Sequence, residues 1–117
     1  MSDGINKAIL IGNLCTQPEL RETLGAGKSV CNFRVCTNSR HGKGEHRRSK
    51  TEWHNVVTWG QLAEMCAEHL EAGSRVYLEG HLQTNKWEDK HGNERVTTEI
   101  VAEKVVFLNR KGDPDAK

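Results

Sequence analysis

Hydrophobic and polar residues alternate over several short segments of the chain, which is the pattern of half-buried β-strands. The clearest alternation lies at 30–38, where Cys31, Phe33 and Val35 fall on one face and polar side chains fall on the other. Segment 6–14 is rich in Ile and Leu, and segment 50–59 is rich in the strand-favouring residues Val, Thr and Trp. Two further strands are predicted at 75–84 and 95–108. The polar segment 19–24 is either a short strand of its own or the continuation of the first strand after a bend.

One segment has helical rather than strand periodicity. Apolar residues recur at helical spacing over 61–72, and Gly73 stands where a glycine often ends a helix. The helical positions are Leu62, Met65, Cys66, His69 and Leu70. Glycine-containing turns are predicted at 25–27 and at 89–94, and segment 39–49 is predicted to be a loop. Gly80 inside the fourth strand predicts a bulge or a sharp bend.

The predicted order is three strands, one helix and two further strands. This order is that of an OB-fold, a five-stranded Greek-key barrel that has a helix between its third and fourth strands. A chain of 117 residues suits one domain, which we place at 1–108. Residues 109–117 are predicted to be a short, disordered polar extension.

Composition favours a cytoplasmic protein. No apolar run approaches the roughly 20 residues that span a bilayer, and the first residues lack the basic and apolar regions of a signal peptide. The four cysteines, Cys15, Cys31, Cys36 and Cys66, include no C-x-x-C pair. We therefore expect them to be free thiols that act as small core residues, and we expect no metal and no cofactor.

Charge is distributed unevenly along a chain whose formal net charge is only +1. Residues 40–50 hold five basic side chains and one acidic one, a local charge of +4, so that the remaining residues sum to −3. The predicted helix carries Glu64, Glu68 and Glu71 and neither Lys nor Arg. This distribution predicts one cationic and one anionic surface.

Two of the three tryptophans lie directly after the basic segment. Trp53 and Trp59 are six residues apart, so a regular strand directs both to the same face, about 20 Å apart along the strand. Burial in the barrel core is the alternative, but Asn55 lies between them on that face and opposes a dry core. Exposed aromatic rings beside a basic loop suit the stacking of bases and the binding of phosphates. Trp87, at the foot of a polar hairpin, is a third stacking candidate.

Four motifs in the same order resemble bacterial single-stranded DNA-binding proteins. They are NKAILIGNL at 6–14, TEWHNVV at 51–57 with LAE at 62–64, GSRVYLEG at 73–80, and KW at 86–87 leading to TTE at 97–99. The resemblance implies an OB-fold and a homotetramer. It also implies non-catalytic, sequence-independent binding of single-stranded DNA in the nucleoid during DNA replication, recombination and repair.

The resemblance also implies site residues. Base stacking falls on Trp53, Trp59 and Trp87, and contacts to the DNA phosphates or backbone fall on Lys7, Arg21, Arg34, Arg40, Lys43, Arg47, Arg48, Lys50 and Lys86. The implied oligomer interface contains Asn6, Ala8 and His54. The family often has another aromatic residue in the loop after the second strand, where this chain has Arg40 and His41. Basic residues common near Gln83 and Asn85 are missing, and Asp3 stands where a basic residue is frequent, so we expect fewer phosphate contacts.

Two other functions remain open at this point. The family usually has a long flexible tail whose acidic tip recruits replication and repair proteins, and we expect such partners only if a tail exists beyond this chain. Without that tail, a dimeric relative specialised for primosome assembly or plasmid transfer is an alternative. A metal-dependent enzyme that uses His41 and His46 is a third hypothesis, although no serine, cysteine or carboxylate has an evident catalytic partner.

Overall fold

The computed structural model describes residues 3–22 and 27–109 and contains one helix and six strands in those ranges. The strands and helices, in chain order, are β1 (Ala8–Leu14), β2 (Glu19–Glu22), β3 (Ser29–His41), the 3-10 turn η1 (Gly44–His46), β4 (Arg48–Trp59), α1 (Gly60–His69), β5 (Arg75–Glu88) and β6 (Glu94–Phe107). The predicted extension at 109–117 lies almost entirely outside the described residues, as does most of the predicted turn at 25–27.

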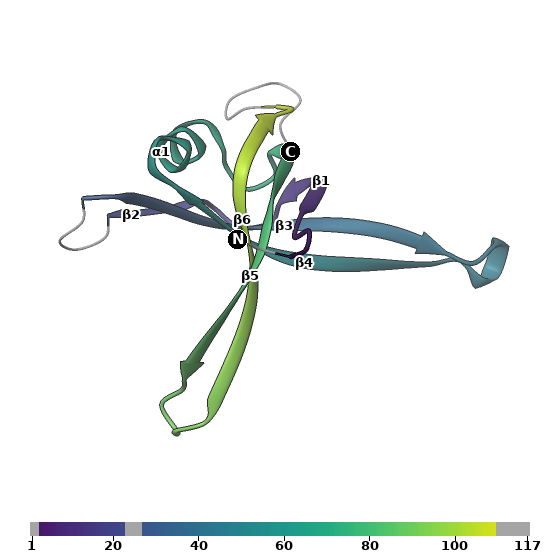
Figure 1. Ribbon diagram of the computed structural model, residues 1–117. Coiled ribbons are helices and arrows are strands. Elements are labelled where there is room, and N and C mark those ends of the chain that lie inside the picture. Colours follow the sequence, from purple (N-terminus) through teal and green to yellow (C-terminus); the bar gives the residue numbers. More distant parts are fainter. Residues whose placement is uncertain (1–2, 23–26, 110–117) are drawn as a thin grey trace.

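Five of the strands close into a barrel. The strand order is β1-β5-β6-β4-β3, and β1 also pairs with β3, which closes the sheet on itself. All of these pairs are antiparallel except β4 with β6. β2 lies outside the ring and pairs only with β3, so the polar segment is a strand of its own. The predicted OB-fold is confirmed, with α1 between the third and fourth strands of the barrel (Figure 1).

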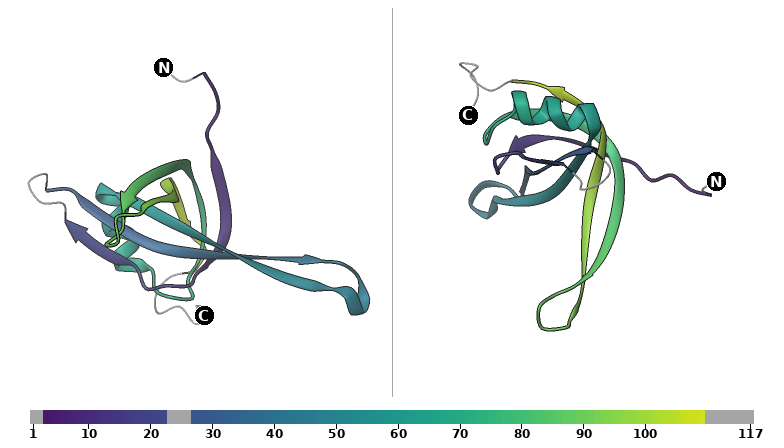
Figure 2. Two further views of the ribbon diagram at one scale, coloured as in Figure 1. Left: turned by 90° about the horizontal axis from the view of Figure 1, so that it is seen from below. Right: turned by 90° about the vertical axis from the view of Figure 1, so that its left-hand side faces the viewer.

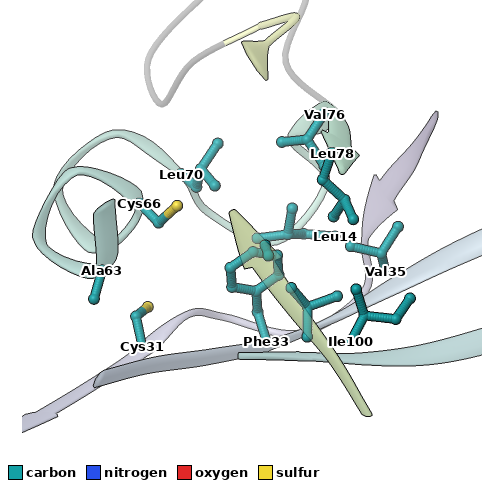
Figure 3. Packing of buried hydrophobic residues seen from close by; sticks show 12 residues of the cluster. Leu14, Cys31, Phe33, Val35, Ala63, Cys66, Leu70, Val76, Leu78 and Ile100 are labelled. Atoms are coloured by element: carbon teal, nitrogen blue, oxygen red, sulfur yellow. The ribbon is translucent and has the colours of Figure 1, made fainter. Parts of the chain in front are cut away.

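The core lies between the barrel and α1. Apolar side chains from β3, β5 and β6 meet Ala63, Cys66 and Leu70 from the helix segment (Figure 3). Phe33 and Val35 are buried as their alternation predicts. Met65, one of the positions at helical spacing, is exposed.

The helix also ends earlier than predicted. Leu70 has an extended backbone, and the Glu71 amide donates a hydrogen bond to Ser74 Oγ at 3.0 Å. Gly73, with a φ of 97°, therefore belongs to the turn that follows and not to the helix end.

Two hairpins extend well beyond the barrel in different directions (Figures 1 and 2). We call residues 38–53 the β3–β4 arm and residues 83–99 the β5–β6 arm. The predicted loop at 39–49 is too long, because β3 continues to His41 and pairs with the start of β4 at Arg48. Polar residues form strand here because both faces of the ribbon meet solvent and because Thr51 Oγ1 donates a cross-strand hydrogen bond to Asn38 Oδ1 at 2.6 Å.

Gly80 marks an irregularity, as predicted. The β5–β6 register shifts between Glu79 and Gly80, and a Cβ at Gly80 would meet the carbonyl oxygen of Val101. Only a glycine allows the two backbones to approach this closely. The shift bends the strand where the barrel gives way to the β5–β6 arm.

The expectation of four free thiols is wrong for one pair of cysteines. Cys15 and Cys36 form a disulfide, with their Cα atoms 6.1 Å apart. The sequence hides this pairing because it depends on the register of β1 with β3, in which Asn13 lies opposite Cys36. Cys31 and Cys66 are free, buried core residues, as expected. Within the described ranges, no helix is long and apolar enough to cross a membrane.

Candidate nucleic-acid interface

The outward face of β3 and β4 carries two exposed tryptophans. Trp53 retains 60% of its accessible surface and Trp59 retains 46%, which excludes burial of either ring in the core of this chain. Asn55 and Val57 lie between them on the same face of β4. Their partners on β3, Arg34 and Asn32, share this face. We call this surface the tryptophan face.

A groove of about 370 Å³ crosses the tryptophan face between the two rings. Asn55 and Val57 of β4 form its floor with Asn32 and Arg34 of β3. The segment Thr16–Glu19 borders the groove on the β2 side, and Thr97 and Glu99 of β6 border it on the other. The lining consists mostly of amide, hydroxyl and charged groups, with apolar contributions from Phe33, Val56 and Val57.

Hydrogen bonds hold the lining of the groove in place. Arg34 Nε donates to Asn55 Oδ1 at 3.1 Å across the β3–β4 ladder. The Arg34 amide donates to Thr16 Oγ1 at 2.9 Å, which attaches the β1–β2 connection to β3. On the far border, Asn85 Nδ2 donates to Glu99 Oε1 at 2.6 Å. The groove is therefore shaped before any ligand is bound.

Trp87 lies on the β5–β6 arm and is 51% exposed. Its register partner is Arg95, so it shares a face of the arm with Thr97 and Glu99, the residues that border the groove. Trp87 Nε1 donates to Thr97 Oγ1 at 2.9 Å. That bond fixes the edge of the indole and leaves its π-face for another contact. Trp87 therefore shares a face of the arm with two residues that border the groove, but it lines a separate hollow with Lys86, Glu88 and Glu94.

The predicted phosphate-binding residues do not all lie beside this groove. Arg34 lines the groove. Val30 of β3 pairs with Arg21 on one side and with Trp59 on the other, so Arg21 lies across β3 from Trp59. Arg40 shares the tryptophan face farther along the β3–β4 arm. Other basic side chains of the β3–β4 arm lie elsewhere. Arg48 and Lys50 have the opposite parity, while Lys43 and Arg47 flank η1 at its tip.

The remaining two basic residues are farther from the tryptophans. Lys86 alternates with Trp87 and so lies on the reverse face of the β5–β6 arm. Lys7 lies just before β1, with its Nζ 3.5 Å from Glu79 Oε1. A hydrogen bond from the Tyr77 hydroxyl, with Lys7 as a further contributor, lowers the pKa of Glu79 below its ordinary value. Lys7 is thus engaged on a different surface.

The loop histidines form no metal site in the structure. His41 Nε2 lies 3.1 Å from Ser39 Oγ, in the β3–β4 arm. Among residues 3–22 and 27–109, no three His, Cys, Asp or Glu side chains gather in a way that could hold a metal ion.

The predicted oligomer-interface residues are engaged within the chain. Asn6 pairs with the backbone of Leu82 through Nδ2 at 2.9 Å and Oδ1 at 2.8 Å, and Ala8 packs against the core. His54 Nε2 lies 2.9 Å from Thr37 Oγ1. On the outward side of β1, Ile9 and Ile11 are 55% and 50% exposed. The exposure of this apolar pair could not be predicted, because residues 8–11 are all apolar and do not alternate.

Sequence and structure comparisons agree with this geometry. The family model described as the single-strand binding protein family matches residues 5–108. The chain is similar to "Single-stranded DNA-binding protein 1" of Chlorobaculum tepidum, with 43% identity over 114 residues that cover 95% of this chain and 69% of that protein. Among solved structures, it is similar to the Plasmodium falciparum SSB complex with ssDNA, with a TM-score of 0.81 and 29% identity. That match covers 93% of this chain and 99% of the other.

Proposed function

The chain belongs to the single-strand binding protein family, and from this we propose that it binds single-stranded DNA, without sequence preference, along the groove of the tryptophan face. The family consists of DNA-binding proteins and not of enzymes, in agreement with the expected lack of catalysis. The observation that carries the proposal is the pair of exposed indoles, Trp53 and Trp59, on the strand face where Asn55 and Val57 between them line a groove.

Base stacking supplies the attraction that does not depend on sequence. Every base has a π-face, so exposed Trp53, Trp59 and Trp87 can each stack on any nucleotide. The strand would lie over the groove, whose polar lining can accept and donate hydrogen bonds. Since stacking is worth about 1–3 kcal/mol per base, three rings account for a substantial part of a useful affinity.

Charge determines where the phosphates would lie. Glu19 and Glu99 border the groove and repel phosphate groups, so that bases rather than phosphates occupy it. Arg21 and Arg40 lie on the tryptophan face toward opposite ends of the groove and would neutralise the backbone as it enters and leaves. Arg34 bonds Asn55 through Nε, so its Nη atoms would donate hydrogen bonds to a base or to a phosphate.

The direct test is titration of a fluorescently labelled oligothymidine with the purified protein, followed by anisotropy at low salt. We expect saturable binding, together with quenching of tryptophan emission when unlabelled oligothymidine is added. A duplex of the same length serves as the control and should bind far more weakly. Absence of both signals at low salt would contradict the proposal.

We propose further that the protein is a homotetramer. The outer face of β1, β5 and β6 presents Ile9 and Ile11 beside Tyr77 and Val106, which the strand register brings to one surface. Val106 is 40% exposed, so this face leaves apolar area that another copy could cover. Asn6 and Ala8 lie at the edge of this apolar face, and His54 lies beneath the tryptophan face. These three residues would support the interface indirectly, by holding the strands that form it in place.

Solution mass tests the assembly. We expect a tetramer, and Ile9→Asp should shift it toward smaller species, whereas Met65→Asp on α1 should not. A stable dimer would instead favour the specialised accessory protein.

We place the function in the cytoplasm, on the exposed single strands of DNA replication, recombination and repair. Replication and repair proteins are expected partners if an acidic tail exists beyond this chain.

A further inference from the structure

The Cys15–Cys36 disulfide adjoins the groove, and DNA binding as described above gives it no role. Cys36 lies directly opposite Trp53 in the β3–β4 register and therefore shares the tryptophan face. Such directly paired side chains have Cβ atoms about 4.5–5.5 Å apart. Cys15 immediately precedes Thr16 and Gln17, which line the groove. One sulfur is thus beside a stacking ring and the other beside the groove border.

The two cysteine pairs differ in their access to a reagent. Cys15 and Cys36 are partly exposed, whereas Cys31 and Cys66 are 0% exposed. Burial raises the pKa of Cys66 to about 12 and also raises the pKa of Cys31, so neither forms the reactive thiolate readily near neutral pH. Thiol–disulfide exchange is therefore confined to the pair beside the groove.

The disulfide is the one covalent attachment between the β1–β2 connection and β3. Otherwise, the Cys15 amide donates to the Arg34 carbonyl at 2.9 Å, and the Arg34 amide donates to Thr16 Oγ1 at the same distance. Farther along, the Ala72 amide donates to Gln17 Oε1 at 3.1 Å. The β2–β3 ladder holds the far end of this border from Glu19 on, and the crosslink adds a covalent constraint at its start.

We propose that Cys15–Cys36 is a reversible redox site that sets the affinity of the groove for single-stranded DNA, an inference that rests on the function proposed above. A dithiol reductant would attack one sulfur through its thiolate, form a mixed disulfide, and leave as its own cyclic disulfide. Two electrons and two protons pass to the protein, which then carries two thiols. Exchange with a disulfide oxidant such as oxidised glutathione reverses the reaction.

The expected direction follows from preorganisation. With the crosslink closed, the groove border is held in its binding geometry, and less conformational entropy is lost when DNA binds. With the crosslink open, residues 16–18, which precede the β2–β3 ladder, lose one constraint and must be ordered further when DNA binds. The oxidised form should therefore bind more tightly. In a compartment that keeps thiols reduced, disulfides are usually transient and redox-sensing, which suits such a role.

The experiment compares oligothymidine affinity, by anisotropy, after equilibration with oxidised glutathione or with dithiothreitol. Alkylation of the unfolded protein and intact mass verify the state, with two thiols expected in the oxidised form and four in the reduced form. We expect the dissociation constant to rise about fivefold or more on reduction, the lower end of typical coupling between two sites. The Cys15→Ser/Cys36→Ser variant should bind like the reduced protein in both buffers.

The possible outcomes separate the two proposals. Equal affinities of the oxidised and reduced wild-type protein, or failure of the disulfide to form with oxidised glutathione, would overturn the redox inference and leave DNA binding intact. A redox response that persists in the double variant would also overturn it. If neither form binds oligothymidine, the proposed function is wrong and the redox inference is wrong with it. Far-UV circular dichroism of both forms checks that reduction has not unfolded the barrel.

Discussion

Replacement of Trp53 by alanine is the sharpest test of the stacking surface. The ring is 60% exposed and lies on the ribbon of the β3–β4 arm, so its removal takes little buried area from the fold. Substitutions at such positions usually change the free energy of unfolding by no more than about 0.5 kcal/mol. The loss of one base stack costs about 1–3 kcal/mol of binding free energy, which at 25 °C is a factor of roughly 5 to 150 in the dissociation constant.

Trp59→Ala should behave similarly in binding. Trp59 is 46% exposed and is the N-cap residue of α1, but its side chain makes no capping hydrogen bond, so its truncation should leave the helix in place. The two rings are about 20 Å apart, far enough for their effects to add. The double variant Trp53→Ala/Trp59→Ala should therefore lose the sum of the two binding free energies. That loss should exceed the loss in relatives whose loop supplies another ring.

The assay is anisotropy of a labelled oligothymidine at one fixed salt concentration, because the phosphate contribution varies steeply with salt. Met65→Ala is the matched control, since Met65 is a large apolar residue with the same 46% exposure as Trp59 but lies on α1. Trp53→Phe should retain part of the affinity through its smaller ring. A Trp53→Ala variant that unfolds at the wild-type temperature and binds within about twofold of wild type would refute the stacking argument.

Four further predictions concern the scaffold and its charges. Gly80→Ala places a Cβ against a β6 carbonyl at the bulge and should lower the free energy of unfolding in urea by about 1–3 kcal/mol. Leu78→Ala leaves a cavity at a fully buried position and should cost about 2–5 kcal/mol in calorimetry. Arg40→Gln should make the slope of log affinity against log salt shallower by about 0.7. Hydrogen bonds to Asp89, the largest contribution coming from the Asn93 amide, lower the pKa of its carboxyl group. The tip of the β5–β6 hairpin should therefore be stabilised above the unfolded carboxyl pKa of about 3.9 and lose that stabilisation as the pH falls through the lower folded pKa. The Asn93 amide resonance measured against pH reports the change.

The parts of the fold and site that depend on local geometry could be predicted from the sequence. Side chains alternate strictly along a strand, so the shared face of Trp53 and Trp59 and the inward face of Phe33 follow from counting. Gly80 marked the bulge because no other residue allows two backbones to approach so closely. Residues 8–11 are all apolar, so alternation could not indicate that Ile9 and Ile11 lie on the exposed face of β1.

Features that depend on strand register could not be predicted. Thr97 and Glu99 reach the groove only because β6 lies beside β4, and nothing in their own segment indicates it. Cys15 and Cys36 are 21 residues apart and meet because β1 runs alongside β3. The length of the β3–β4 arm was also missed, since polar composition predicts a loop unless the pairing partner is known.

Register also changes what the basic segment can do. In the sequence it is one cluster, but on a two-stranded ribbon successive side chains point to opposite sides. Arg40 shares the tryptophan face, whereas Lys50 lies on the reverse side, 3.3 Å from Glu52. Only the cations of one side can neutralise a strand stacked on Trp53. We therefore expect stacking to supply a larger share of the binding free energy than nine candidate basic residues suggest, and affinity to fall with salt less steeply than their number predicts.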